Sequence, residues 1–455
     1  MEFKQYPSYK KSGVEWLGDV PEHWESNRLK KYLIERNEKN SPIKTDNLLS
    51  VTMYQGVIPV SEKQGNGGNK PKENLENYKI SYPNDIVLNS MNVIVGSVGL
   101  NKYTGLISPA YYALYNRNKN NNIKFFSYIF HNPFFQKGLF GLGNGIMYKE
   151  SEDGKLNTIR LKIPMEKLNQ VVLPCPSISE QNQIVAFLNT ETTRIDNLIA
   201  KQEKLIELLE EQRKSIISHA VTKGLNPNAP MKDNGVEWLG EVPEHWTVLK
   251  NRHIFNFSKG LSITKENLQE SGIPCVSYGE VHSKFGFEFN PEINDMKFVS
   301  EEYLETSKNC LLNSGDFIFA DTSEDFEGSG NFSYLNSNSQ VFAGYHTVIA
   351  RLKSKQKPRF FAYIFDSNAH RKQIQTQVKG IKVFSITQGI LKDIYSWLPP
   401  VHEQDLIVEY LDNECKKISL LKAKQTELIE KLKEYRASII SHAVTGKIDV
   451  RAFGA

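Results

Sequence analysis

One segment of this chain occurs twice with a single substitution. Residues 13–24 read GVEWLGDVPEHW and residues 235–246 read GVEWLGEVPEHW, an offset of 222 residues. A second pair, SIISHAVT, occupies residues 215–222 and 438–445, an offset of 223. The sequence between these segments differs widely. Near-identical ends around dissimilar interiors are not typical of a solenoid, and they predict one scaffold duplicated to carry two different domains.

The chain continues in a similar way after both SIISHAVT copies. Lys223 and Gly224 follow the first copy, and Gly446 and Lys447 follow the second. The first copy leads through a linker into the second GVEWLG segment, whereas the second copy is followed by a short tail, residues 446–455. We therefore expect the C-terminal tail to pack near the N-terminus, which would complete a pseudo-two-fold arrangement.

Two long segments contain neither Gly nor Pro, and each begins shortly after a proline with a Glu-Gln pair, Glu180-Gln181 or Glu403-Gln404. They predict long helices, with Ser179 as the candidate N-cap of the first. Apolar residues recur at spacings of three and four, which indicates coiled-coil seams, and polar residues at matching seam positions fix register. The predicted seam residues are Leu188, Ile195, Gln202, Leu209, Arg213, Ile216, Leu411, Ile418, Gln425, Leu432, Arg436 and Ile439.

The divergent interiors indicate mixed α/β domains. Apolar runs after Asp85 and Asp316 predict short buried strands, and residues 125–135 and 360–365 predict aromatic helices. The expected fold class is α+β, with two mixed α/β domains joined by two long antiparallel coiled-coil helices in a pseudo-two-fold arrangement. The predicted segments are a first domain (1–175), a central helix (176–222), a linker (223–235), a second domain (236–398), a distal helix (399–445) and a tail (446–455).

Composition limits the possible functions. The 455 residues include 56 basic and 52 acidic side chains, so a nucleic-acid interface would have to be a local patch. The four cysteines lie far apart without a CxxC pair, which indicates reduced thiols and neither a disulfide framework nor a zinc site. The sequence shows no secretory leader and no apolar stretch of membrane-spanning length, so we expect a cytoplasmic protein that does not contact membranes.

Catalytic motifs are absent or incomplete. His131-Asn132-Pro133-Phe134 is similar to the Asn-Pro-Pro-aromatic motif of adenine methyltransferases, but it lacks the second proline and no glycine-rich cofactor loop accompanies it. A helix interruption in a domain core is the simpler interpretation. We therefore expect a chain that is not an enzyme, has no catalytic or metal-binding residue and binds no cofactor of its own.

The paired GVEWLGxVPEHW segments, the paired Glu-Gln helix starts and the paired heptad helices together resemble the specificity subunit of type I restriction–modification systems. The resemblance spans the whole chain. It implies two target-recognition domains that each read half of a bipartite, asymmetric site in double-stranded DNA. It also implies that the helices act as a ruler and dock two adenine-N6 methyltransferase subunits, which hold S-adenosylmethionine, and that two restriction/translocase subunits join for restriction.

Candidate DNA-binding residues follow from this resemblance, because a glycine-containing loop after the aromatic helix commonly faces DNA in the family. Side chains that donate or accept hydrogen bonds on such loops suit base edges and phosphates. The alternative is that each is an ordinary solvated loop residue. The candidates are Tyr54, Gln55, Lys70, Asn144, Gly145, Lys149 and Arg160 in the first domain, and Tyr278, Glu280, Lys379, Gly380 and Lys382 in the second.

Two other functions remain as alternatives. A coiled-coil scaffold would bind proteins and show no sequence preference for DNA. A self-contained DNA methyltransferase with degenerate motifs would transfer methyl groups without a partner. The sequence does not specify the DNA target or the spacing between its halves.

Overall fold

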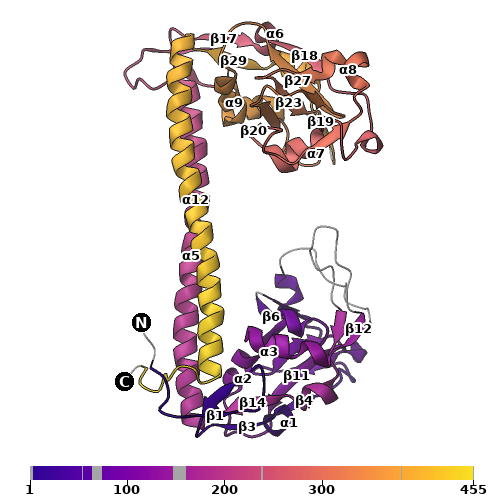
Figure 1. Cartoon of the computed structure of the whole chain (residues 1–455), viewed down its shortest axis with the longest axis vertical. Coiled ribbons are helices and arrows are strands. Elements are labelled where there is room, and N and C mark those ends of the chain that lie inside the picture. Colours follow the sequence, from indigo (N-terminus) through magenta and orange to yellow (C-terminus); the bar gives the residue numbers. More distant parts are fainter. Residues whose placement is uncertain are drawn as a thin grey trace. The chain divides into compact units, whose positions relative to one another are not determined.

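The computed structural model describes residues 4–53, 55–63, 74–146, 160–236, 239–380 and 382–453. The chain divides into two compact units, each of which is described by itself below. The first unit comprises Met1–Glu203 and Thr426–Ala455, and the second comprises Lys204–Gln425. The division falls within both long helices, α5 (Ile178–Lys223) and α12 (Val401–Val444), so each helix contributes one part to each unit (Figure 1). The sequence instead predicts segment boundaries at the two ends of each long helix, and these boundaries stay a prediction.

The two helix segments pack antiparallel within each unit. In the first unit, Gln183 on α5 contacts Arg451, and Asp196 further along α5 pairs with Arg436 at 2.8 Å. Residue numbers therefore rise along α5 as they fall along its partner. In the second unit, Glu210 pairs with Lys422 at 2.5 Å.

The predicted seam residues all lie at least half-buried. Most apolar seam side chains are buried. The polar seam side chains are partly exposed, because their polar ends reach solvent at the edge of the seam. Leu188, Ile195, Leu209, Leu411, Ile418 and Ile439 are buried, and Gln202, Arg213, Ile216, Gln425, Leu432 and Arg436 are half-buried.

Helix α5 starts two residues earlier than a cap at Ser179 would allow. Ile178 is already helical, and the hydroxyl of Ser177 accepts a hydrogen bond of 3.3 Å from the backbone N–H of Glu180. The prediction that Ser179 caps the helix was therefore wrong, and Ser177 occupies the capping position.

Each unit contains the same central antiparallel sheet. In the first unit the strand order is β4-β11-β8-β9, and in the second it is β18-β27-β23-β25, with β20 added in parallel at the edge. Strands β8 and β23 are buried along their whole length, as the apolar runs predict. The strands are β4 (Leu33–Arg36), β8 (Ile86–Asn89), β9 (Val98–Leu100) and β11 (Tyr111–Asn116), and β18 (Phe255–Lys259), β20 (Glu288–Phe289), β23 (Phe317–Ala320), β25 (Phe332–Leu335) and β27 (Thr347–Leu352).

Aromatic helices cover the sheet in both units. The first unit has α2 (Ile123–Phe130) and α3 (Pro133–Gly138), and the second has α9 (Pro358–Asp366) and α10 (Asn368–Gln375). Asn132 caps α3 by accepting a hydrogen bond from Phe134 N–H at 2.8 Å, so the Asn-Pro sequence is a break between two helices. Buried phenylalanines of α2 and α3 contribute to the core of the first unit, and those of α9 contribute to the core of the second.

Smaller sheets and helices complete each unit. In the first unit the strand pairs are β1 (Tyr9–Lys11) with β2 (Asp19–Pro21), β3 (Glu25–Arg28) with β14 (Val172–Cys175), β5 (Leu49–Thr52) with β6 (Gly56–Pro59), β7 (Lys79–Ser81) with β10 (Gly105–Ile107), and β12 (Asn144–Ile146) with β13 (Arg160–Lys162). In the second they are β15 (Met231–Asp233) with β16 (Glu241–Pro243), β17 (Thr247–Lys250) with β29 (Tyr395–Leu398), and β24 (Thr322–Ser323) with β28 (Phe384–Ser385). The second unit also has a four-stranded sheet of β21 (Lys297–Val299), β19 (Ile273–Val276), β26 (Val341–Ala343) and β22 (Leu311–Leu312). The short helices are α1 (Leu29–Tyr32), α4 (Met165–Leu168), α6 (Asn251–Ile254), α7 (Tyr278–Glu280), α8 (Tyr303–Thr306) and α11 (Gln388–Asp393).

Neither long helix, nor any other helix among the described residues, is apolar enough over a sufficient length to cross a membrane. The four cysteines are free thiols. In the described part of the chain, no three His, Cys, Asp or Glu side chains form a group suited to a metal ion.

Candidate nucleic-acid interface

The repeated motifs form a structural joint between each domain and its long helix. In the first unit the Glu180 carboxylate accepts hydrogen bonds from the Trp24 indole N–H at 3.0 Å and the Tyr6 hydroxyl at 2.6 Å, and lies 3.0 Å from His23 Nε2. Trp24 is completely buried, and burial together with the Glu180 carboxylate raises the pKa of Tyr6. A buried carboxylate with this many partners fixes the helix start against the domain.

The second unit repeats this joint. Trp246 N–H donates to Glu403 at 3.1 Å, and His245 Nε2 lies 2.7 Å from the same carboxylate. In both units the second tryptophan of the repeated segment, Trp24 or Trp246, therefore packs the domain against its long helix. Trp16, from the same repeat, packs edge-on against Phe135. Its counterpart Trp238 lies outside the described residues.

The neighbouring glutamines make a second matched contact. Gln181 side-chain N–H donates to the Pro176 carbonyl at 2.9 Å, and its oxygen accepts from the Asn122 N–H that begins α2. Gln404 donates to the Pro399 carbonyl at 2.9 Å and accepts from Lys357 N–H, just before α9. Each Glu-Gln pair therefore holds two segments of its domain at once.

The residues after each SIISHAVT segment close the joint. Lys223 Nζ donates to the Glu241 carbonyl, and Lys447 Nζ donates to the Asp19 carbonyl. Gly446 has a φ of +70°, and a β-carbon there would lie 2.4 Å from Pro21. In the first unit, therefore, the C-terminal tail contacts the N-terminal segment directly.

A glycine with nearly the same backbone φ follows the aromatic helices in both units. Gly145 in β12 has a φ of +155°, and Gly380 has a φ of +157°. Residues 144–146 pair with 160–162 in the first unit, and Lys379 bridges Ser385 in the second. We call each of these paired segments, residues 144–146 with 160–162 and residues 379–385, a glycine arm. Both arms bring candidate DNA-binding residues together.

In the first unit the structure places four of the seven candidates. Asn144 and Gly145 are exposed in β12, and Arg160 is opposite Ile146 in β13. Gln55 is exposed in the turn of the separate β5–β6 hairpin. Tyr54, Lys70 and Lys149 lie outside the described residues.

In the second unit the candidates Tyr278 and Lys379 are linked through a continuous set of contacts. The Tyr278 ring contacts His346 and His282, with ring centroids 5.4 and 6.2 Å apart. His282 Nε2 lies 2.7 Å from the carbonyl of Thr322, and strand β24, which contains Thr322, pairs with Ser385 of the glycine arm.

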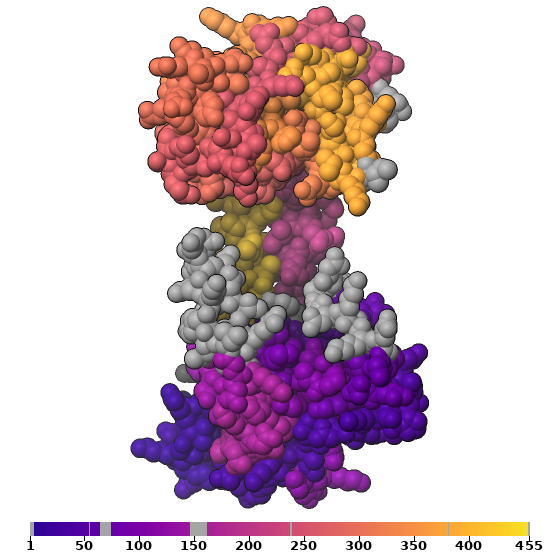
Figure 2. All heavy atoms as spheres, turned by 90° about the vertical axis from the view of Figure 1, so that its right-hand side faces the viewer, coloured from indigo at the N-terminus to yellow at the C-terminus, as the bar shows by residue number. Residues whose placement is uncertain are grey.

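Three further candidates lie close to this set. Lys382 and Gly380 are exposed on the glycine arm. Glu280 is half-buried, and one of its carboxylate oxygens accepts a hydrogen bond of 3.0 Å from the Ser277 N–H in a capping box. On the face of the second unit shown in Figure 2, the segment before the aromatic helix (salmon) and the segment after it (amber) form two adjoining halves.

Sequence reasoning missed several residues that the fold adds to these surfaces. Lys162 lies opposite Asn144 in the first glycine arm, and Lys167 Nζ donates to the Asn144 side chain at 3.0 Å. His282 and His346 join the second surface, and His346 has an exposed side chain and a φ of +55°. A non-glycine residue with positive φ is uncommon and is enriched at functional sites, but it has no signature in sequence.

Comparison with known proteins identifies related chains. A family model described as "Type I restriction modification DNA specificity domain" matches residues 243–431. The MjaVIII specificity subunit of a type I restriction enzyme from Methanocaldococcus jannaschii is 27% identical over 283 residues, which cover 62% of this chain and 63% of that protein. The chain therefore matches less than two thirds of that relative's length.

Two longer alignments extend the likeness. The putative MjaX specificity subunit from the same organism is 25% identical over 472 residues, which cover 99% of both chains. A solved structure described as the "structural basis underlying complex assembly and conformational transition of the type I R-M system" has a TM-score of 0.67 and 15% identity, and the match covers 93% of this chain and 98% of that one. At that identity the structural likeness shows the fold alone.

Proposed function

The chain belongs to the specificity-subunit family of type I restriction–modification systems, and from this premise we propose that its two units read the two halves of a split, asymmetric DNA site. The observation that carries the proposal is the pair of glycine arms. Each arm follows the aromatic helices of its unit and contains a glycine with nearly the same φ, but the side chains differ, with Asn144 and Lys162 in one and Lys379 and Lys382 in the other. Equivalent supports with different side chains read different base sequences.

The chain is a non-catalytic recognition component, so methyl transfer requires a partner. We propose that the partner is an adenine-N6 methyltransferase subunit, which holds S-adenosylmethionine, and that restriction/translocase subunits join the complex for cleavage of double-stranded DNA. The incomplete Asn-Pro motif is used as a helix break, which speaks against methyl transfer by this chain alone.

Exposed leucines on the long helices support docking of two such partners. Leu205 on α5 and Leu428 on α12 are 39% and 40% exposed and occupy equivalent positions in the two helix repeats. Leu421 on α12 is 44% exposed, and its equivalent on α5, Leu198, is half-buried. An apolar surface that occurs twice binds the same partner twice.

The test is to co-express the chain with a cognate adenine methyltransferase and to sequence the methylated sites in DNA. We expect a motif in two parts. Replacing the second glycine arm, residues 379–385, changes one part, and replacing residues 144–146 together with 160–162 changes only the other.

Two results would favour the alternatives. A stable complex whose methylation pattern is unchanged by either replacement would favour a protein scaffold. Methylation by the purified chain without a partner would favour a self-contained methyltransferase.

A further inference from the structure

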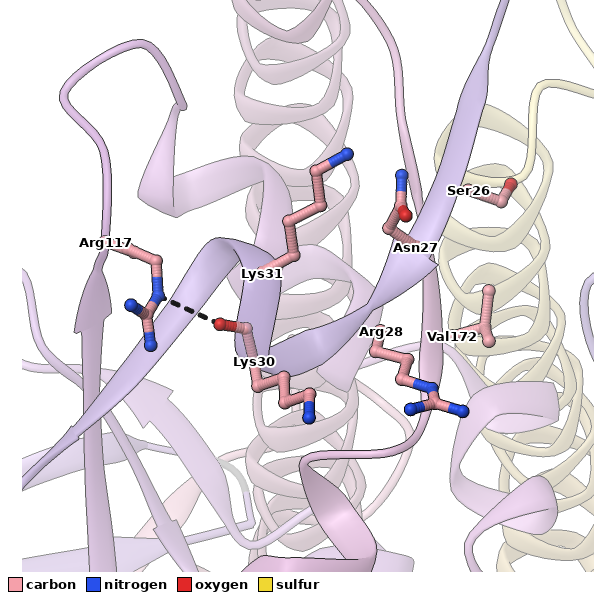
Figure 3. Close-up of a pocket in the computed structure, with 7 residues that line it drawn as sticks. All are labelled: Ser26, Asn27, Arg28, Lys30, Lys31, Arg117 and Val172. Carbon is pink, nitrogen blue, oxygen red and sulfur yellow. Dashed lines mark hydrogen bonds between the residues drawn. The ribbon is translucent and has the colours of Figure 1, made fainter.

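A basic pocket of about 600 Å³ lies in the first unit, where strand β3 leads into helix α1 (Figure 3). One of its lining residues, Val172, has an apolar side chain; the others are polar or charged. The lining residues are Ser26, Asn27, Arg28, Lys30, Lys31, Arg117 and Val172.

Three of the basic side chains lie together, and no acidic side chain among the described residues pairs with them. Arg28 and Lys30 are exposed, and within the described residues their side chains make no ion pair or hydrogen bond. Arg117 Nε donates to the Lys30 carbonyl at 3.0 Å, which positions its guanidinium beside them. These three side chains extend to the same side in Figure 3, whereas Lys31 extends away from them, and Lys31 is 3.4 Å from Glu25.

The second unit contains the equivalent location and provides an internal comparison. Arg28 lies opposite Val172 in the β3–β14 pair, as Lys250 lies opposite Tyr395 in the β17–β29 pair. Lys353 Nζ donates to the Arg252 carbonyl, which matches the contact of Arg117 with Lys30. Two residues before Val172 is Gln170, and two residues before Tyr395 is Asp393.

The differences between Gln170 and Asp393, and between Val172 and Tyr395, change the electrostatics of this location. In the second unit Asp393 forms an ion pair with Arg252 and lies 3.6 Å from Lys250, whose ammonium also lies over the Tyr395 ring. In the first unit Gln170 has no charge and Val172 has no ring. The same arrangement of cations is thus neutralised in one unit and left available for an anion in the other.

We propose that this pocket in the first unit is a phosphate-binding site. Guanidinium groups bind phosphate oxygens through paired, charge-assisted hydrogen bonds, and a lysine adds a point charge. Ser26 and Asn27 supply a hydroxyl and an amide beside them, and the buried Ser26 hydroxyl has no hydrogen-bond partner among the described residues. The phosphate comes either from a nucleic-acid backbone or from a nucleotide.

This phosphate site is separate from the glycine arm that we propose to read bases. Within the first unit, β12 of the glycine arm lies at the opposite end from α1 and β3 (Figure 1). An acidic protein partner fits the pocket less well, because the core of a protein interface is apolar and depleted in charge, whereas Val172 is the one apolar lining residue.

The experiment uses the full chain and two probes at low salt: inorganic pyrophosphate measured by calorimetry, and a short random-sequence duplex measured by anisotropy over a salt series. The informative variant is Gln170→Asp, which restores the acid of the second unit and keeps every cation. A double variant, Arg28→Gln with Lys30→Gln, removes two cations directly. The matched control is Arg252→Gln, whose charge is already paired with Asp393.

We expect Gln170→Asp to weaken binding at least about tenfold for the probe that uses the site. A loss with pyrophosphate identifies a nucleotide or free phosphate as the source. A loss confined to the duplex, with the salt slope lower by about 2 in the double variant, identifies the nucleic-acid backbone. Unchanged binding of both probes in Gln170→Asp, or an equal loss in Arg252→Gln, would overturn the proposal.

Discussion

The indole N–H of Trp24 donates a 3.0 Å hydrogen bond to the carboxylate of Glu180, which lies 156 residues further along the chain. The same bond recurs between Trp246 and Glu403 at 3.1 Å. The most nearly identical part of the sequence is therefore a joint that attaches each domain to its helix. The Trp–Glu bond is repeated because both domains need the same attachment to their helix.

Removing the Glu180 carboxylate is expected to destabilise the first unit. In Glu180→Ala the Tyr6 hydroxyl and the Trp24 indole lose their acceptor inside the core. The free energy of unfolding should fall by about 2–4 kcal/mol, measured by urea denaturation. The control Glu25→Ala, at an exposed carboxylate, should change it by less than about 0.5 kcal/mol. Equal effects of the two changes would show that the joint adds no stability.

His370 is expected to make the second unit sensitive to acid. The side chain is fully buried, and burial lowers its pKa from the usual 6.5 to about 3. The unfolded chain therefore binds a proton that the folded chain excludes between these values. Stability is complete above pH 6.5 and falls as the pH drops towards 3, by up to about 1.4 kcal/mol per pH unit.

The substitution His370→Phe distinguishes the contribution of His370 to acid sensitivity from the contribution of the carboxylates. The imidazole nitrogens have no hydrogen-bond partner among the described residues, and the ring packs against Phe365 with centroids 4.6 Å apart. His370→Phe should therefore keep stability at neutral pH and flatten its decline below pH 6.5, measured by urea midpoints across the range. The same decline in both proteins would exclude His370 as its cause.

Gly380 is expected to be essential for the shape of the second glycine arm. A β-carbon there would lie 2.1 Å from the Val383 carbonyl oxygen, and the φ of +157° already disfavours other residues. Gly380→Ala should weaken recognition of one half of the methylated motif and leave the other half unchanged.

The control for Gly380 is Gly389→Ala in helix α11, where the nearest atom would lie at an ordinary 3.4 Å. Sequencing of methylated sites measures both variants. Unchanged recognition in Gly380→Ala would indicate that the arm does not read DNA.

The exposed leucines are expected to bind the methyltransferase. Leu205→Lys and Leu428→Lys each place a charge on one of the two equivalent surfaces, so each variant should retain about one partner, and the double variant none. Light scattering of the purified complex measures this. Ala423→Lys, at another exposed position on α12, should leave the stoichiometry unchanged. Binding of two methyltransferase subunits by the double variant would exclude this surface as their docking site.

Much of the fold was predictable because its signals are local or repeated. The heptad spacing predicted α5 and α12, and apolar runs predicted β8 and β23. The helix cap was wrong by two residues, since Ser177 and Ser179 are both suitable caps and only the backbone conformation distinguishes them.

The candidate DNA-binding residues stay a prediction, and the fold adds to them residues that sequence did not single out. Lys162 joins Asn144 through strand pairing, and His282 joins Thr322 across 40 residues of sequence. Such contacts depend on which strands pair, and the sequence of a short strand does not specify its pairing partner.

By itself the sequence determined the duplication, the long helices and the mixed α/β class, because periodicity and repeated motifs indicate them. Only the tertiary structure decided why the motifs repeat and where the two copies differ electrostatically. Glu180 meets Trp24 through packing of distant segments, and Gln170 is seen to replace Asp393 only after the strands of both units are aligned by their hydrogen bonds. The physical reason is that burial and charge pairing act between residues that are close in space, whereas sequence patterns report only residues that are close along the chain.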